Sequence, residues 1–223
     1  MGGAGAKANV TQVDDTRWIA KFPAKDDDKN MSAWEMLAHK LATACKINMP
    51  DAKLLRLGSQ WRTFAVKRFV RSKGRRIHYA SAMTMLKQEN SDQSSYVDIA
   101  QFIMSRGATG SVKEDWAQLF RRVIFNVMIS NRDDHLRNHG FNLEPTGWHL
   151  SPAFDLNPNI DKAEQALNLD MNAQSSQAWE SDFYGRVLCT DKRPSKKMIS
   201  ERLVVVEGGG IHGKKSSKFQ RVK

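Results

Sequence analysis

The densest group of reactive side chains in the sequence lies at residues 131–139. This run reads Asn-Arg-Asp-Asp-His-Leu-Arg-Asn-His and holds two carboxylates, two histidines and two asparagines. Within it, Asn138 follows Asp133 by five positions, and another carboxylate, Asp155, lies seventeen positions beyond Asn138. Residues 145–147 predict a turn between two short strands, and this hairpin would return Asp155 to the side of the loop.

The aspartate, the asparagine five residues later and the second aspartate form a phosphotransferase constellation. Asp133 would position the attacking hydroxyl and accept its proton. Asn138 and Asp155 would hold Mg²⁺, which prefers oxygen ligands. The metal would neutralise charge on the transferring phosphoryl group, so the predicted reaction is magnesium-dependent phosphate transfer.

The start of the sequence contains groups suited to holding phosphates. Gly2, Gly3 and Gly5 lack the Cβ atom that would keep backbone amides away from a phosphate. Lys21 falls on a strand expected at residues 18–22, from which its ammonium would reach the α- and β-phosphates. The other interpretations are a flexible glycine-rich end and an exposed strand lysine.

Glu35 lies on a helix expected at residues 32–45, where it would hold Lys21 in place. The apolar stripe of that helix includes Trp34, together with Leu37, Ala38, Leu41 and Ala42. Ser32, three positions before Glu35, gives the pair the form of a capping box. Glu35 is therefore open to two interpretations, a partner of Lys21 and a helix cap.

The elements expected around these residues change from strands to helices along the chain. The first part has two further strands, at residues 52–57 and 61–70. The later part has short helices at residues 80–87 and 97–105, and a longer capped helix that begins at Ser111. The apolar face of this longer helix consists of Trp116, Leu119, Phe120, Val123, Ile124, Val127 and Met128. The predicted fold class is α+β, with a strand-rich start and a mainly helical body.

The composition is that of a globular protein with an unevenly placed positive charge. The chain has 223 residues, 40% of them hydrophobic and 26% charged, with a formal net charge of +11. Residues 186–223 contain eleven Lys or Arg and three Asp or Glu, a net of +8. This end is either a solvated charged segment or one that attracts phosphates without specificity.

Three features of the sequence indicate where in the cell the protein is expected. No apolar run approaches the roughly 18–20 residues of a membrane span. The first residues lack the charged and apolar regions of a signal peptide. Cys45 and Cys189 have no spacing for a zinc site or a disulfide framework. A reducing cytoplasm without membrane attachment is therefore expected.

The loop at residues 131–139 also admits a second enzymatic interpretation. His135 and His139 are four positions apart, a spacing that on a helix suggests a metal pair. With Asp133, Asp134 and Asp155 they would form a metal-dependent hydrolase. Both histidines lie beside asparagines in a loop, however, so a hydrogen-bonded, structural His135 is favoured.

Two runs of residues resemble those of a known family. The first, at residues 131–138, is Asn-Arg-Asp-Asp-His-Leu-Arg-Asn, and the second, at residues 150–158, is Leu-Ser-Pro-Ala-Phe-Asp-Leu-Asn-Pro. In this order and spacing they resemble the HipA-like serine/threonine kinases, the bacterial toxins of toxin–antitoxin modules. Supporting similarity extends from Gly2 to about Gln174 and fades beyond about Asp182.

The resemblance implies a protein-kinase-like fold of two lobes. We expect a partial, strand-rich N-lobe with the glycine loop at residues 1–68. A mainly helical C-lobe at residues 69–182 would hold the catalytic loop and the metal-binding motif. A basic C-terminal segment would occupy residues 183–223. Family members carry a further N-terminal subdomain before the glycine loop, whereas this sequence starts at the loop. A truncated N-lobe with a separately encoded subdomain is therefore expected.

The resemblance also implies roles in the C-lobe. Asp133 matches the family's catalytic aspartate, Asn138 its magnesium-binding asparagine, and Asp155 its metal-binding aspartate. Arg137 would steady the γ-phosphate. The implied cofactors are ATP and Mg²⁺.

In the N-lobe, Lys21 matches the lysine that grips the phosphates. Lys67 and Phe69 fall where backbone groups of the hinge between the lobes receive adenine. The family hinge commonly reads Glu-Arg-Phe-Asp, whereas residues 67–70 of this chain read Lys-Arg-Phe-Val.

Family members transfer the γ-phosphate to a hydroxyl on a protein, including aminoacyl-tRNA synthetases. Their usual partner is a helix-turn-helix antitoxin that binds DNA, so contact with DNA is expected indirectly, through that complex. The alternative function is a catalytically inactive, kinase-like fragment that binds the antitoxin or DNA.

Overall fold

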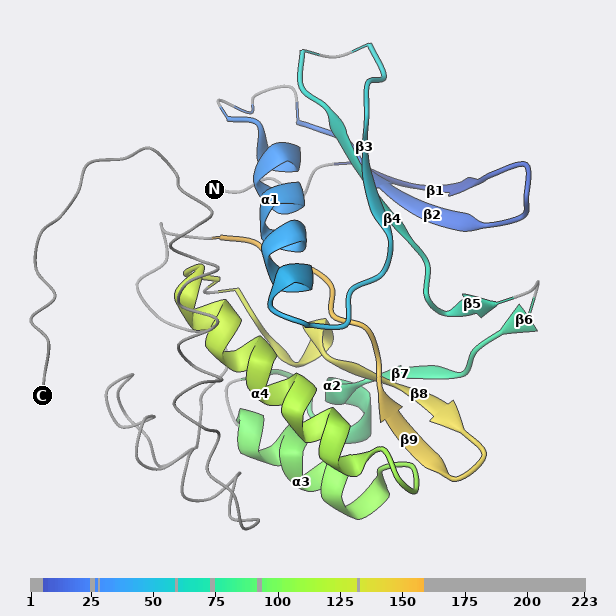
Figure 1. Ribbon diagram of the computed structural model, residues 1–223, viewed down its shortest axis with the longest axis vertical. Helices are drawn as coiled ribbons and strands as arrows, with labels where there is room; N and C mark the ends of the chain where they lie inside the picture. Colours follow the sequence, from blue (N-terminus) through green and yellow to red (C-terminus); the bar gives the residue numbers. More distant parts are fainter. Residues whose placement is uncertain are drawn as a thin grey trace, which may run out of the picture. The chain divides into compact units, whose positions relative to one another are not determined.

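The computed structural model of the chain describes residues 6–24, 27, 29–58, 60–72, 75–91, 94–131 and 133–158. These residues all belong to one compact unit, Met1–Arg193. Gly2, Gly3 and Gly5, and the basic segment expected at residues 183–223, lie outside the described residues. The described elements form an α+β fold of two lobes, a sheet with one helix and a helical group that carries a smaller sheet (Figure 1).

An antiparallel sheet of four strands forms the N-lobe. Its strands are β1 (Lys7–Thr11), β2 (Arg17–Lys21), β3 (Ala52–Leu55) and β4 (Thr63–Lys67), in the order β1-β2-β4-β3. Ala20 in β2 pairs with Ala65 in β4, and both are buried. The strand predicted at residues 18–22 is confirmed one position earlier, and those predicted at residues 52–57 and 61–70 are confirmed with shorter bounds, whereas β1 was not anticipated.

Helix α1 (Met31–Ala44) packs against β3 and β4 of this sheet. It begins at Asn30, whose side-chain oxygen accepts a hydrogen bond from the backbone amide of Ala33 at 3.1 Å. The capping box predicted at Ser32 is therefore wrong, because Ser32 already lies inside the helix and is buried. Trp34 was expected in the buried stripe but is 39% exposed.

A short antiparallel ribbon leads from the N-lobe to the C-lobe. It consists of β5 (Arg71–Ser72) and β6 (Arg75–Arg76), with Arg71 as the cross-strand partner of Arg76. In Figure 1 the ribbon and the turn between β1 and β2 extend to the same side of the molecule. The ribbon therefore adds charged side chains beside the hinge predicted at residues 67–69.

Helices and a second sheet form the C-lobe. Its elements are β7 (Tyr79–Ser81), α2 (Ala82–Met85), α3 (Tyr96–Arg106), α4 (Val112–Met128), the 3₁₀ turn η1 (Leu136–Asn138), β8 (Gly140–Glu144) and β9 (Gly147–Leu150). The strands lie in the order β7-β8-β9. The predicted hairpin is confirmed as β8 and β9. The helix predicted at residues 80–87 is shorter, because residues 79–81 pair with β8 instead.

The caps of the two longer C-lobe helices differ. At α3, Ser95 and Asp98 form a reciprocal capping box. At α4, Ser111 makes no side-chain cap bond, and its hydroxyl donates to the carbonyl of Ala108 at 2.9 Å. The cap predicted at Ser111 is therefore wrong, although the helix begins where expected.

Helix α4 carries both the core of the C-lobe and a polar face. Leu119, Phe120 and Val123 are fully buried, as the predicted apolar face requires. Arg122 and Asn126 are equally buried, at 1% and 0% exposure. Buried polar groups need hydrogen-bond partners, and those of Asn126 lie in the loop that follows α4. None of the helices in the described part of the chain has the length and apolar character needed to cross a bilayer.

Candidate functional site

The polar loop starts with a tight turn at the end of α4. Ser130 has a left-handed backbone, with φ of 54°, and the amide of Asn131 donates to the carbonyl of Asn126 at 2.8 Å. The side-chain amide of Asn131 also donates to the side-chain oxygen of Asn126, at 2.9 Å. These two bonds fix the direction in which the loop leaves the helix.

Asp133 and Asn138 face each other across the loop. The side-chain nitrogen of Asn138 donates to the backbone carbonyl of Asp133 at 3.1 Å, and its backbone amide donates to the carbonyl of His135 at 2.8 Å. Asn138 is only 9% exposed, whereas Asp133 is exposed to solvent. The loop therefore presents an accessible carboxylate beside a fixed carboxamide.

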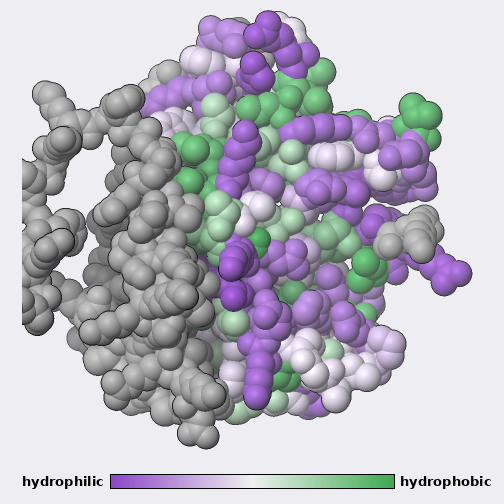
Figure 2. All heavy atoms as spheres, in the orientation of Figure 1, coloured by the Kyte–Doolittle hydropathy of each residue, from purple (hydrophilic) through white to green (hydrophobic). Residues whose placement is uncertain are grey.

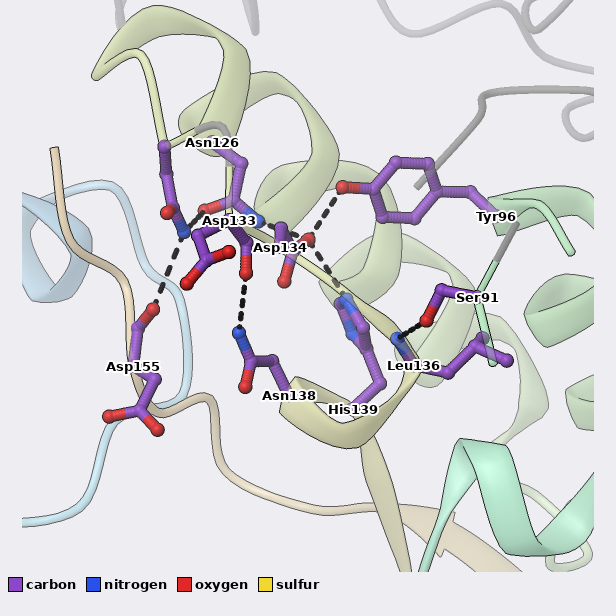
Figure 3. Close-up of polar contacts among 10 residues, drawn as sticks. Ser91, Tyr96, Asn126, Asp133, Asp134, Leu136, Asn138, His139 and Asp155 are labelled. Carbon is purple, nitrogen blue, oxygen red and sulfur yellow. Dashed lines mark hydrogen bonds and ion pairs between the residues drawn. The ribbon is translucent and has the colours of Figure 1, made fainter. Parts of the chain in front are cut away.

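Asp155 reaches the same place from the segment after β9. The side-chain nitrogen of Asn131 donates to the backbone carbonyl of Asp155 at 3.4 Å, which ties this segment to the loop. Asp155 has a left-handed backbone, with φ of 55°, a conformation that aspartate tolerates better than most residues. Figure 3 shows Asp133, Asn138 and Asp155 gathered on one side of the loop. The structure thus brings together the three residues that the sequence predicted to converge.

A buried network lies on the opposite side of the loop (Figure 3). One carboxylate oxygen of Asp134 accepts hydrogen bonds from the hydroxyl of Tyr96 at 2.5 Å and the side chain of Asn126 at 2.6 Å, and lies 3.0 Å from Nε2 of His139. Tyr96, Asn126, Asp134 and His139 are all at most 3% exposed. The network therefore anchors the loop from within the core.

Burial and the partners of Asp134 shift its pKa in opposite directions. Burial would raise the pKa of Asp134, but His139 and the hydrogen bond from Tyr96 outweigh it and hold the pKa below its usual value. Burial, together with the charge of Asp134, raises the pKa of Tyr96 well above its usual value. An ionised Asp134 is thus part of the folded core.

This burial also bears on the hydrolase interpretation. Asp134 and His139 point into the core and bond to each other, whereas Asp133 and Asp155 face the other side of the loop. No cluster of three or more His, Cys, Asp or Glu that could hold a metal occurs in the part of the chain that the structure describes. The five residues of that hypothesis therefore do not form one site.

Lys21 forms an ion-paired triad with two carboxylates. Its ammonium bonds to Glu35 on α1 and to Asp155 of the C-lobe. Burial would lower the pKa of Lys21, but both carboxylates outweigh it and raise the pKa above its usual value. Burial raises the pKa of Glu35, which Lys21 only partly offsets, whereas the pKa of Asp155 is lowered because Lys21 outweighs burial. Glu35 is therefore the partner of Lys21, as one of its two interpretations predicted.

A cavity of about 620 Å³ lies between the lobes next to this triad. Ligand pockets typically measure about 300–1,000 Å³, so the space suits a nucleotide. Lys21, Glu35 and Asp155 line one part of it, and apolar side chains including Ile19, Val66 and Phe154 line its walls. An apolar slot beside a lysine matches a ligand with a flat base at one end and phosphates at the other.

Aromatic rings form the C-lobe wall of the cavity. The ring of Phe69 lies 5.8 Å from that of Tyr79 and 5.9 Å from that of Phe154, between ring centroids. Gly140 lies against the Tyr79 ring so closely that any Cβ atom there would overlap it. Burial raises the pKa of Tyr79 to about 12, so this wall stays neutral at physiological pH.

The predicted hinge residues and loop residues are placed differently. Lys67 and Phe69 line the cavity, and the amide of Lys67 donates to the carbonyl of Asp51 at 2.8 Å. Asp133, Asn138 and the exposed Arg137 are not among the residues that line it. Asp155 lines the cavity and is also hydrogen-bonded to Asn131 of the loop, so it joins the cavity to the loop.

The donor set fits magnesium. The side-chain nitrogen of Asn138 donates to the backbone carbonyl of Asp133, so the side-chain oxygen of Asn138 points away from that carbonyl. Asp155 adds carboxylate oxygens. Hard cations such as Mg²⁺ take oxygen ligands of these two kinds. The described residues therefore include two ligands of suitable chemistry, of which Asp155 lines the cavity.

Sequence reasoning missed the residues that support the loop. The sequence predicts Arg122 and Asn126 within a helix and leaves Tyr96 just before another, with no role for any of them, yet all three are buried polar side chains. Arg122 donates to the carbonyl of Ser151, on the segment that leads to Asp155. The signal was present in α4, where Arg122 and Asn126 are four positions apart and interrupt its apolar face.

Comparisons with known proteins agree with this architecture. The family described as the HipA-like C-terminal domain matches residues 1–206. Among solved structures, HipA of Shewanella oneidensis MR-1, in complex with HipB and its operator DNA, matches with a TM-score of 0.67 and 14% identity. This match covers 94% of the present chain and 63% of HipA, so the chain spans less than two thirds of that relative's length.

A second similar structure is the proinflammatory kinase CtkA of Helicobacter pylori. It matches with a TM-score of 0.56 and 14% identity, over 94% of this chain and 89% of CtkA. At this identity both likenesses concern the fold alone. No curated protein sequence matches the chain.

Proposed function

This chain belongs to the family of the HipA-like C-terminal domain, and on that premise we propose that it is an ATP-dependent protein serine/threonine kinase. It would transfer the γ-phosphate of ATP to a hydroxyl on a protein, with Mg²⁺ as cofactor. The observation that carries the proposal is the position of Asp155. It contacts Lys21 at the cavity and is tied by Asn131 to the loop that holds Asp133 and Asn138.

The residues of the chain divide the work of phosphate transfer. Lys21, held by Glu35, neutralises phosphate charge inside the cavity. Asn138 and Asp155 would hold Mg²⁺, which when bound offsets negative charge on the phosphoryl oxygens.

Asp133 orients the target hydroxyl and takes its proton. The hydroxyl oxygen then forms the new bond to phosphorus as the bond to the leaving ADP breaks. Arg137 lies four positions after Asp133, is exposed, and would steady the γ-phosphate. Lys67 and Phe69 would receive the adenine at the hinge end of the cavity, and Gly2, Gly3 and Gly5 the phosphates.

The proposed partners follow from the relatives. HipA of Shewanella oneidensis forms a complex with HipB and its operator DNA. We extend this to the present chain as a helix-turn-helix antitoxin partner, a DNA contact made through that partner, and a cytoplasmic location.

The test separates nucleotide binding from phosphate transfer. ATP binding is measured by calorimetry with and without Mg²⁺, and transfer is measured from γ-³²P-ATP to casein and to myelin basic protein. In Asp133→Asn, ATP should still bind while transfer falls by about 10²–10⁴-fold, the loss typical of a missing general base. Glu144→Gln, on the exposed end of β8, is the matched control and should transfer at the parental rate.

Two results would contradict the proposal. If Asp133→Asn transfers phosphate as fast as the parent, Asp133 is not the base. If the parent binds no ATP, the cavity is not a nucleotide site, and the alternative of a fragment that only binds the antitoxin or DNA is favoured.

A further inference from the structure

Four arginines gather at the hinge end of the cavity. Arg68, Arg71 and Arg76 line the cavity itself. Arg17, at the start of β2, accepts a hydrogen bond on its carbonyl from the amide of Arg68 at 2.7 Å. We call Arg17, Arg68, Arg71 and Arg76 the arginine cluster. Figure 2 shows mainly hydrophilic surface (purple) on the side where β1, β2, β5 and β6 lie.

The positive charge of this cluster is not balanced. Arg71 and Arg76 are cross-strand partners in the β5–β6 ribbon, and like charges directly opposite each other destabilise a pair of strands. Within the described residues, no salt bridge includes any of the four guanidinium groups. The guanidinium of Arg68 has a neutral partner, the side-chain oxygen of Asn9 at 2.8 Å. A bound anion would relieve this repulsion.

The electrostatics of Arg71 agree with this geometry. Loss of water contact and the charges of Arg17, Arg76 and Arg68 lower the pKa of Arg71, and the carboxylate of Asp15 offsets them only in part. The strongest neighbours of this guanidinium are therefore other cations.

The cluster is separate from the phosphate-binding end of the cavity. Arg17 and Lys21 stand at opposite ends of β2, which at the rise of an extended strand places their Cα atoms roughly 13 Å apart. The two acidic residues that line the cavity, Glu35 and Asp155, both bond to Lys21. The hinge end is therefore lined by cations without an acidic residue.

The residue types at this end indicate what it binds. In the dinucleotide sites of Rossmann folds, an acidic side chain accepts the ribose hydroxyl, whereas an arginine accommodates a phosphate on the ribose, and the same chemistry applies to other ribose sites. Guanidinium groups also match phosphate oxygens in bidentate geometry. Arg71 and Arg76 follow the hinge in sequence and line the cavity, so their guanidinium groups are available to a phosphate on the ribose of a nucleotide bound there.

We propose that the arginine cluster binds a second phosphate, carried on the 2′ or 3′ oxygen of the ribose of an adenine nucleotide in the cavity. This rests on the proposed nucleotide site and adds a ligand class to it. An acidic segment of a protein substrate is less well supported, because Asp133, which would orient the target hydroxyl, does not line the cavity. Such a nucleotide would occupy the same space as ATP and compete with it.

The experiment compares AMP with adenosine 2′,5′-bisphosphate and adenosine 3′,5′-bisphosphate by calorimetry on the full chain. At least one bisphosphate should bind about tenfold or more tightly than AMP, since each charged hydrogen bond contributes substantially. In the double variant Arg71→Ala, Arg76→Ala this preference should fall to about threefold or less. The matched control, Lys87→Ala with Lys113→Ala, removes two positive charges from exposed positions outside the cavity and should keep the preference.

Binding of AMP shows that the protein is folded and that the nucleotide site is intact, independently of the ribose phosphate. If AMP and ATP bind to the parent but neither bisphosphate binds more tightly, the ribose-phosphate proposal is wrong while the kinase proposal stands. The ribose-phosphate proposal would be equally wrong if the arginines were found to bind an acidic peptide instead. A preference that persists in the double variant, or that disappears equally in the lysine control, would also overturn it. If the parent binds no nucleotide at all, both proposals fail.

Discussion

The ammonium of Lys21 bonds to the carboxylate of Asp155, 134 residues further along the chain. This ion pair connects the N-lobe sheet to the segment that follows β9. Glu35 holds the same ammonium from α1. The triad therefore serves two purposes, since it joins the lobes and places a cation and a carboxylate at one end of the cavity.

Removing the cation of the triad should make stability depend on pH. In Lys21→Met, Glu35 and Asp155 lose their shared partner, so the pKa of both carboxyls in the folded state should rise. When the pKa of a carboxyl is higher in the folded than in the unfolded state, the free energy of unfolding is unaffected at low pH. It falls as the pH rises through the pKa of the folded state. We expect a loss of about 1–2 kcal/mol in the free energy of unfolding near neutral pH, shrinking toward about pH 4.

Urea unfolding of Lys21→Met and the parent at several pH values measures this difference. Lys40→Met, which removes an exposed lysine from α1, is the control and should change stability by less than about 0.5 kcal/mol. A loss that is equal at all pH values would show that the triad is not electrostatically coupled.

The carboxylate of Asp155 should be required for the effect of magnesium on nucleotide binding. In Asp155→Asn we expect the gain in ATP affinity that Mg²⁺ gives the parent to fall by at least about tenfold, because a charged oxygen ligand has been replaced by a neutral one. Calorimetry with ATP in Mg²⁺ and in EDTA checks this. Asp51→Asn, an exposed carboxylate near the hinge, serves for comparison. An unchanged magnesium effect would place the metal elsewhere.

The buried carboxylate of Asp134 should contribute stability above its unfolded pKa. The folded pKa lies below the usual value, so the contribution is complete above about pH 4 and is lost as pH falls through the folded value. Asp134→Asn should therefore lower the free energy of unfolding by about 2–4 kcal/mol near pH 7 and flatten its dependence on pH under acidic conditions.

Unfolding in urea between about pH 3 and 7 measures the effect of Asp134→Asn. Combining it with Tyr96→Phe tests the hydrogen bond between the two residues. The double variant should lose less stability than the sum of the single ones, with a coupling of about 1 kcal/mol. Simple additivity would mean that Tyr96 does not stabilise the carboxylate.

Asn131 should position the site without binding the substrate. Its side chain links Asn126 to the carbonyl of Asp155, so Asn131→Ala should displace the segment around Asp155 relative to the loop. Small displacements of this kind cost up to about 10²-fold in rate, whereas the affinity for ATP should stay within about threefold. Rates of phosphate transfer at saturating ATP, compared with the exposed control Gln101→Ala, separate these effects. A weaker ATP affinity at an unchanged rate would contradict this role.

The sequence predicted local features well because their signals are local. The hairpin after the loop follows from the turn at residues 145–147, and α4 as a buried helix follows from its apolar spacing. The convergence of Asp133, Asn138 and Asp155 required only that this hairpin be short. The resemblance of the two motifs added the kinase-like fold, which is confirmed.

The errors arose where distant parts of the chain decide the outcome. Residues 79–81 form a strand and not a helix because β8, about sixty residues later, supplies their partners. Ser32 resembles a cap, but the helix begins at Asn30 and packs Ser32 into the interior. The four-position spacing of Arg122 and Asn126 indicates a shared helix face, but it does not show that this face is buried, since burial of polar groups depends on partners in other segments.

The cavity itself could not be predicted from the sequence. Its lining combines β2, α1, the hinge, the β5–β6 ribbon and the segment around Asp155. The arginine cluster is likewise formed by pairing of β5 with β6 and of β2 with β4. Only the folded arrangement shows that these charges face one space.

Gly140 has a consequence for the depth of the cavity, although it is not one of the residues that line it. The ring of Tyr79 occupies the volume that a side chain at position 140 would need. An alanine there would displace the ring of Tyr79, which lines the cavity. The absence of a side chain at Gly140 thus determines how much space the ring of Tyr79 leaves for a ligand in the cavity.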